Sequence, residues 1–199
     1  TEGSDGRIYD LCRKGTSFLS WEDALAEEDE YINCAKRALL DSDVFIFTLG
    51  LSEIWYDKLT GIVLAQAPPT GAYDPARHVF RLLTPDENIA NIRHALRLLF
   101  EQKPNIHVIL TVSPVPLRAT FFERGAVISN NISKATLLYT AHVICQEYKR
   151  VHYFPSYEIT QYLAKQPFDW DGRHVTEETV DLIMSLFAAN FEKNSTSSG

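Results

Sequence analysis

The chain has 199 residues, 45% of them hydrophobic, and a formal net charge of -7. This size and composition predict a single globular domain over residues 1–192, followed by a flexible Ser-rich tail at 193–199. The acidic balance, without any run of Lys and Arg, argues against nucleic acid and anionic membrane surfaces as partners. No segment has the length and apolar character of a membrane-inserted span or a signal peptide.

The three cysteines are widely spaced and form no C-x-x-C pair. This pattern argues against a disulfide framework and against a zinc site. We therefore expect a reducing environment and a cytoplasmic location. Two of them, Cys34 and Cys145, fall in helical patterns and are expected to be buried.

Segments of helical and of strand character alternate along the chain. Apolar side chains at helical spacing predict helices over about 21–40, between Pro85 and Pro104, and over about 131–148, 157–166 and 176–191. Continuous apolar runs rich in β-branched and aromatic residues predict buried strands at 43–50, 106–113 and 151–155. Two weaker segments, 61–67 and 77–83, are predicted to form a hairpin or excursion off the main sheet.

This alternation predicts an α/β fold, a three-layer α/β/α arrangement around a mostly parallel central sheet. Right-handed crossovers then place the carboxyl ends of the strands at one edge. Ser52, Ser113 and Ser156 each follow a predicted strand and should lie at that edge, where open α/β sheets bind ligands. Each serine is a candidate nucleophile, and each also fits a structural role in satisfying loose backbone groups.

The segment Asp171-Gly-Arg-His174 precedes the last predicted helix. An acid three residues before a histidine can fold back and hold one ring nitrogen, leaving the other free to take a proton from a nucleophile. For that chemistry, His174 must face the groove above the parallel strands. The same four residues also fit an ordinary surface turn beside a helix cap, so the motif leaves both interpretations open.

Other signatures of chemistry do not occur in the sequence. There is no G-x-S-x-G elbow and no Gly-rich phosphate loop, and the remaining histidines lack metal-ligand spacing. We therefore expect neither a cofactor nor a metal.

Four segments in chain order resemble signatures of the GSCFA domain family. They are FTLGLSEIW at 47–55, TVSPVPL at 111–117, YFPSYE at 153–158 and DGRH at 171–174. The resemblance extends from about Asp5 to Phe187. That family is in turn similar to the SGNH/GDSL hydrolases, three-layer α/β/α proteins that cleave or transfer acyl esters, often on carbohydrates. The resemblance implies an ester hydrolase or O-acyltransferase whose partner is a small-molecule or carbohydrate ester; the sequence predicts no oligomeric state.

The same resemblance implies roles for individual residues. Asp171 would orient His174, which would act as general base and then as general acid. Gly50, Ser52 and Glu53 stand where the hydrolases have Gly-x-Asn-Asp, in which the Asn side chain donates to the oxyanion. A serine hydroxyl can donate with a different reach, whereas an ionised glutamate cannot donate. Together with Ser113, these residues are expected to form the oxyanion- and substrate-binding edge.

The Gly-Ser-Cys-Phe-Ala motif for which the family is named, and whose serine matches the hydrolase nucleophile, does not occur in this chain. We therefore expect the domain to lack its first strand, with the nucleophile supplied from upstream. Two alternatives stay open. The protein is a non-catalytic binding or interaction module on a hydrolase-like scaffold, or it uses a serine within the chain, with Ser113 as the first candidate.

Overall fold

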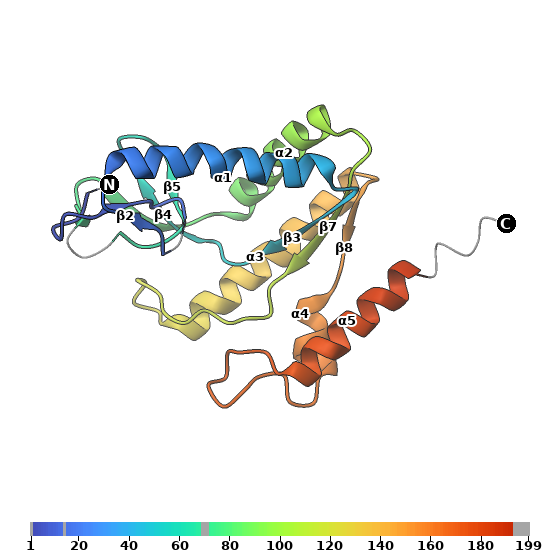
Figure 1. The fold of residues 1–199 in the computed structure, drawn as a ribbon. Helices are drawn as coiled ribbons and strands as arrows, with labels where there is room; N and C mark the ends of the chain where they lie inside the picture. The colour runs from blue at the N-terminus through green and yellow to red at the C-terminus, as the bar shows by residue number, and fades with distance from the viewer. Residues whose placement is uncertain (1, 14, 69–71, 193–199) are drawn as a thin grey trace. The chain divides into compact units, whose positions relative to one another are not determined.

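The computed structural model describes residues 2–13, 15–68 and 72–192 (Figure 1). The chain forms two compact units. The first unit consists of Thr1–Asp43 and Ser52–Thr84, and the second of Val44–Leu51 and Pro85–Gly199. The tail predicted at 193–199 lies outside the described residues.

The second unit is built on a parallel three-stranded sheet with the order β3-β7-β8. Its strands are β3 Val44–Leu49, β7 His107–Val112 and β8 Val151–Tyr153. These confirm the three predicted strands, although β3 is not buried as its sequence predicts. The central strand β7 is buried along its whole length after His107. Its apolar run is therefore that of a strand covered on both faces.

Helices flank this sheet and complete the mixed α/β fold. They are α2 Pro85–Gln102, α3 Ala126–Glu147, α4 Ser156–Glu158 with a π-helical turn at Ile159–Leu163, and α5 Glu177–Glu192. Helix α3 contacts β7 and β8, and α5 packs through Leu182, Ile183, Leu186 and Phe187 against a core of Ile109, Phe154 and Ile159. The core of the unit therefore lies along β7 and β8.

Two helix predictions need correction. Helix α3 begins at Ala126 and not near Asn131, because Gly125, at φ 80, starts the helix without a side-chain cap. The expected start signal is absent from its sequence. The helix expected at 157–166 is shorter and changes from an α-helical to a π-helical turn at Ile159.

Strand β3 lies at an open edge of the sheet. Its sequence predicts a central strand covered on both faces, but among the described strands it pairs only with β7. Val44 and Ile46 are about half exposed. The apolar run indicates a strand that burial would stabilise, and it does not specify which neighbour covers it. An apolar strand with a free edge presents unpaired backbone groups to another strand.

The first unit contains short antiparallel pairs and one long helix. Its elements are the hairpin β1 Ile8–Tyr9 and β2 Ser17–Phe18, helix α1 Trp21–Asp41, and a sheet of order β5-β4-β6 formed by Val63–Leu64, Glu53–Asp57 and His78–Leu82. The predicted strands at 61–67 and 77–83 are confirmed in shorter form. Helix α1 starts after its predicted cap, Ser20, which accepts a hydrogen bond from the Asp23 N–H.

Two details of this unit differ from expectation. Glu53, expected in the loop after the preceding strand, is the first residue of β4 and pairs with Leu82. Cys34, expected to be buried, is exposed, as α1 has no buried residue. In both cases the local apolar pattern does not report the surface against which the segment packs.

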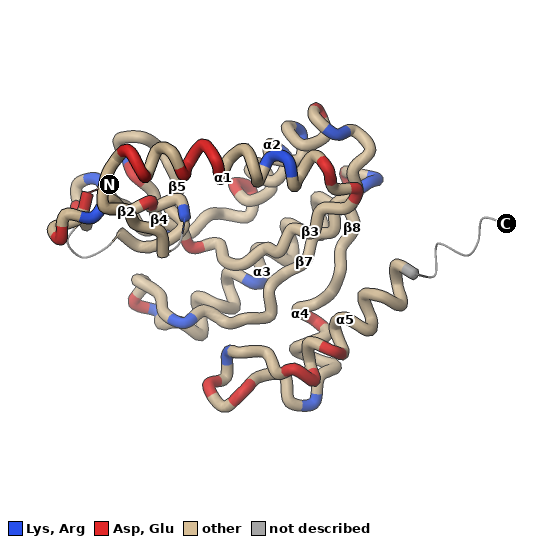
Figure 2. The backbone as a smooth tube through the Cα atoms, viewed as in Figure 1, with Lys and Arg blue, Asp and Glu red and all other residues tan. Residues whose placement is uncertain are grey.

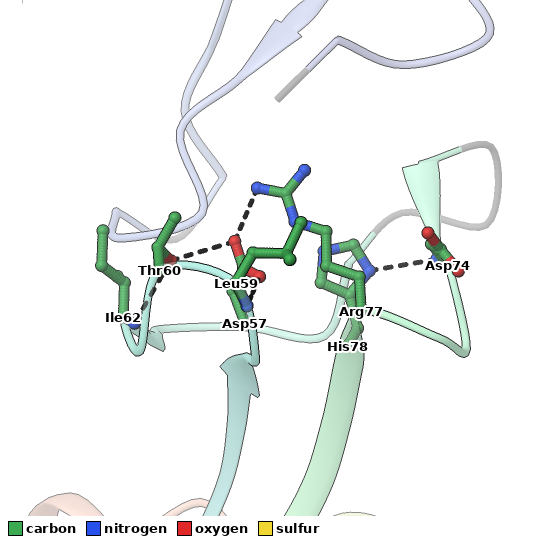
Figure 3. Close-up of polar contacts among 7 residues, drawn as sticks. All are labelled: Asp57, Leu59, Thr60, Ile62, Asp74, Arg77 and His78. Atoms are coloured by element: carbon green, nitrogen blue, oxygen red, sulfur yellow. Dashed lines mark hydrogen bonds and ion pairs between the residues drawn. The ribbon is translucent and has the colours of Figure 1, made fainter.

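A buried carboxylate ties the end of β4 to the residue just before β6. Asp57 accepts hydrogen bonds from the Leu59 N–H at 2.9 Å, the Thr60 hydroxyl at 3.0 Å and Arg77 Nη2 at 2.5 Å (Figure 3). The Arg77 guanidinium holds the pKa of Asp57 well below its usual range, aided by the Leu59 and Thr60 bonds and opposed by burial. The ionised form is therefore favoured in the folded state.

This ion pair predicts acid sensitivity. Because the Asp57 pKa is lower in the folded than in the unfolded chain, its stabilisation is complete above about pH 4 and is lost as the pH falls further. Chemical denaturation between pH 7 and pH 2 measures this. We expect Asp57→Asn to be less stable than wild type at pH 7. Below pH 4 the stability of the variant should fall less steeply than that of wild type, because it lacks the carboxylate that becomes protonated. Equal acid slopes in the two proteins contradict the assignment.

The sheet of the second unit predicts a contrast between two isoleucines paired in register. Ile109 is 2% exposed on β7, whereas its partner Ile46 on β3 is half exposed. Ile109→Ala should lower the free energy of unfolding by about 2–5 kcal/mol, because it leaves a cavity. Ile46→Ala is the matched control and should cost less than half as much. Urea denaturation measures both, and equal losses contradict the edge position of β3.

Candidate active site

The turn that carries Asp171 and His174 is held by backbone hydrogen bonds. The Asp169 N–H donates to the His174 carbonyl at 2.8 Å, and Phe168 and Val175 form an antiparallel bridge at the base. Within the turn, the Gly172 N–H donates to the Asp169 carbonyl at 2.8 Å. Gly172 has φ 68, a left-handed conformation that favours glycine. The Asp-Gly sequence therefore forms the tight turn that the spacing predicts.

Inside this turn, the Asp171 carboxylate contacts His174 through both of its oxygens. Oδ1 accepts from the Arg173 N–H at 2.9 Å and from the His174 N–H at 3.0 Å. Oδ2 lies 2.5 Å from His174 Nδ1. The predicted fold-back of the acid onto one ring nitrogen is confirmed, and Nε2 is left without a partner among the described residues.

The backbone determines the charge of this acid. The His174 and Arg173 N–H groups, in that order, lower the pKa of Asp171 to about 2, and the bond to the imidazole adds to their effect. Asp171 is therefore ionised at neutral pH and can hold the Nδ1–H of the ring. This fixes the tautomer in which Nε2 can accept a proton.

The imidazole itself is open to solvent. The His174 side chain is 77% exposed, and Asp171 is its one hydrogen-bond partner in the described ranges. The expectation that the ring faces a groove above the strands is thus not met by these residues alone. Arg173 Nε donates to the Pro116 carbonyl at 3.3 Å and so ties the turn to the segment that follows β7.

Two predicted residues, Gly50 and Ser113, lie at the carboxyl ends of neighbouring strands. The Ser113 N–H donates to the Leu49 carbonyl at 2.9 Å, which extends the parallel ladder just beyond β7. Ser113 Oγ accepts a hydrogen bond from the Val115 N–H at 3.3 Å, so its own hydroxyl proton is uncommitted among the described residues. The parallel register therefore brings these two residues to the same edge, as predicted.

The other two serines differ from this arrangement. Ser156 is buried, and its Oγ lies 2.5 Å from Thr111 Oγ1 and donates to the Val112 carbonyl at 3.0 Å. Its hydroxyl thus satisfies groups at the end of β7. Ser52 is fully buried in the first unit, where its carbonyl accepts from the Leu83 N–H, and Glu53 belongs to the same unit.

Sequence reasoning missed Lys134. This residue of α3 is only 1% exposed, and its Nζ donates to the Gly50 carbonyl at 3.0 Å. Burial lowers its pKa to about 8. A signal was present in the sequence: Lys134 is the only Lys, Arg, Asp or Glu between residues 126 and 146. An isolated charge within a long stretch of uncharged residues is a candidate for a specific buried contact.

The described residues contain neither a metal-binding cluster nor a membrane-spanning helix. Their His, Cys, Asp and Glu side chains form no group of three or more that could hold a metal ion. Among the helices in the described part of the chain, none combines the length and apolar character needed to cross a membrane (Figure 2 shows the charged positions along them).

The fold and this turn define a mixed α/β protein with an acid–histidine pair in its second unit. A family model, GSCFA family, matches residues 9–187. The chain therefore belongs to the GSCFA family, which confirms the resemblance found in its four sequence signatures. Comparisons with curated proteins and with solved structures give no match.

The geometry predicts that the Asp171 pKa depends on the turn more than on the imidazole. In His174→Ala both backbone donors remain, so the Asp171 pKa should stay below the ordinary value of about 3.9. Carboxyl NMR titration measures it in both proteins. Gly172→Ala, which strains the left-handed turn, should raise the pKa further than His174→Ala does. The opposite order contradicts a backbone-held carboxylate.

Proposed function

We propose that this chain forms part of an SGNH-type ester hydrolase or O-acyltransferase with a three-layer α/β/α arrangement, acting on an acyl ester of a carbohydrate or related small molecule. The hydrogen bond between Asp171 and His174 Nδ1 carries the proposal. It leaves Nε2 available as a base, which is the arrangement required for activating a hydroxyl nucleophile. Membership of the GSCFA family supports it through that family's resemblance to the hydrolases.

In the proposed reaction, His174 Nε2 takes the proton of a serine hydroxyl while the serine oxygen bonds to the ester carbonyl carbon. The carbonyl oxygen becomes an oxyanion. Collapse of this intermediate breaks the bond to the alcohol, which receives the proton from Nε2. Water or a second hydroxyl then gives its proton to Nε2 and bonds to the acyl carbon, and the serine oxygen leaves that carbon and takes the proton back from Nε2. Asp171 stays ionised throughout and stabilises the imidazolium.

The serine is proposed to come from outside these 199 residues. Ser156 is committed to the end of β7 and Ser52 is fully buried, so neither hydroxyl suits the role. The open edge of β3 supports an additional strand, because a parallel strand added there would end beside Gly50. A nucleophile at its end would share that edge with Ser113.

Two alternatives have observations of their own. Ser113 has an uncommitted hydroxyl proton, and Arg173 ties its segment to the His174 turn, although no hydrogen bond joins Ser113 to His174 among the described residues. A non-catalytic binding or interaction module is favoured by the solvent-exposed imidazole. In that case the ring and the β3 edge are recognition surfaces.

The proposal predicts a specific loss of activity. In the full-length gene product, His174→Ala should lower kcat/KM for aryl acetate hydrolysis by at least about 100-fold, because the base is lost. Asp171→Asn should also lower it, since the ring then loses its ionised partner. Steady-state kinetics and labelling by a serine-reactive probe measure both effects.

The control for this experiment is His142→Ala, an exposed histidine of α3, which should keep wild-type activity. Equal activity of wild type and His174→Ala removes His174 from the mechanism. Probe labelling that is lost in Ser113→Ala identifies the serine within this chain. A full-length protein that neither hydrolyses esters nor labels supports the interaction module.

A further inference from the structure

The contact between Lys134 and Gly50 places a buried cation at the carboxyl end of β3. Lys134 is 1% exposed, and of the groups in the described ranges only the Gly50 carbonyl accepts a hydrogen bond from Nζ. An ammonium has three N–H donors. Burying it against a single carbonyl is costly, and an apolar side chain would fill the same space without that cost. The contact therefore calls for a role beyond packing.

The carbonyl that Lys134 binds belongs to the peptide unit between Gly50 and Leu51. The described chain has no cis peptide bond, so this unit is trans and its carbonyl and N–H point in opposite directions. Because Lys134 holds the carbonyl toward α3, the Leu51 N–H is directed away from that helix. Leu51 is 41% exposed, and its N–H has no hydrogen-bond partner among the described residues.

We propose that Lys134 is a positioning residue, which holds the Gly50 carbonyl so that the Leu51 N–H faces the edge of the sheet as an oxyanion donor. This inference rests on the proposed acyl transfer and deepens it. The donor is the backbone N–H of Leu51, the residue before Ser52. It therefore supplies a donor in a chain whose Ser52 stands where the hydrolases have the donating asparagine.

The charge of Lys134 strengthens this arrangement. A hydrogen bond from an ammonium polarises the peptide unit and makes its N–H a better donor, because linked hydrogen bonds reinforce one another. Burial lowers the Lys134 pKa to about 8. Below that pH the amine is charged, and above it the amine loses its proton and the polarising effect weakens. The Leu51 N–H is therefore a weaker hydrogen-bond donor above about pH 8 than below it.

Three variants test the proposal by kinetics in the full-length gene product. Lys134→Met removes the contact and should lower kcat by about 100-fold with little change in KM, the size expected for one lost oxyanion donor. Lys134→Gln keeps a neutral donor that does not titrate. Its kcat should therefore stay constant above about pH 8, where the kcat of wild type decreases. Leu51→Pro deletes the N–H directly and should lower kcat as Lys134→Met does.

The matched control is Lys149→Met, an exposed lysine just after α3, which should leave kcat unchanged. If Lys134 has only a structural role, Lys134→Met will be less stable than wild type. The kcat of its folded fraction and the decrease of kcat at alkaline pH will then be the same as in wild type. That result overturns the proposal. If Lys134→Met does not fold, Leu51→Pro and the pH profile of Lys134→Gln decide the question.

A binding experiment separates this inference from the proposed function. Acetate, the carboxylate product of an acetyl ester, should shift the Leu51 amide NMR signal in wild type and in His174→Ala, but not in Lys134→Met. If the protein has no esterase activity and this shift is still observed, the anion site stands and the acyl-transfer function fails. If esterase activity is present and acetate shifts the Leu51 signal equally in wild type and Lys134→Met, the positioning role fails alone.

Discussion

The carboxylate of Asp171, held by backbone N–H groups of its own turn, is the constraint on which the proposed chemistry depends. Two N–H donors fix one carboxylate oxygen, which leaves the other to hold His174 Nδ1. The turn closes because Gly172 adopts a left-handed conformation. The acid is therefore ionised and oriented within its own turn, so the imidazole needs no further element of the fold to fix its tautomer.

The parallel pairing of β3 with β7 provides the second constraint. It places Gly50 and Ser113 at the same edge of the sheet, and two side chains attach other elements to that edge. Arg173 binds the Pro116 carbonyl, and Lys134 binds the Gly50 carbonyl. In both cases a cation is anchored on a backbone carbonyl near a strand end. The edge is thus organised by backbone groups that side chains orient, which is the basis of the proposed oxyanion donor.

The open edge of β3 and the exposed ring of His174 have a common implication. Apolar β3 residues that are half exposed and an imidazole in solvent are both features that another segment or partner would cover. The two proposed functions differ in what covers them. In the hydrolase it is a strand that brings a serine to Nε2, and in the interaction module it is a binding partner. Burial of the same surfaces therefore has a different chemical result in each.

The sequence by itself determined the local features of this protein. The parallel strands, the Ser20 cap, the family and the Asp171–His174 contact depend on residues close in the chain or on apolar periodicity. Tertiary structure decided that β3 is an edge strand, that Glu53 joins a second sheet, and that Lys134 reaches Gly50, 84 residues away. The physical reason is that periodicity reports how much surface a segment can bury. Which neighbour buries that surface, or which distant carbonyl accepts a buried charge, depends on contacts that form only when the whole chain packs.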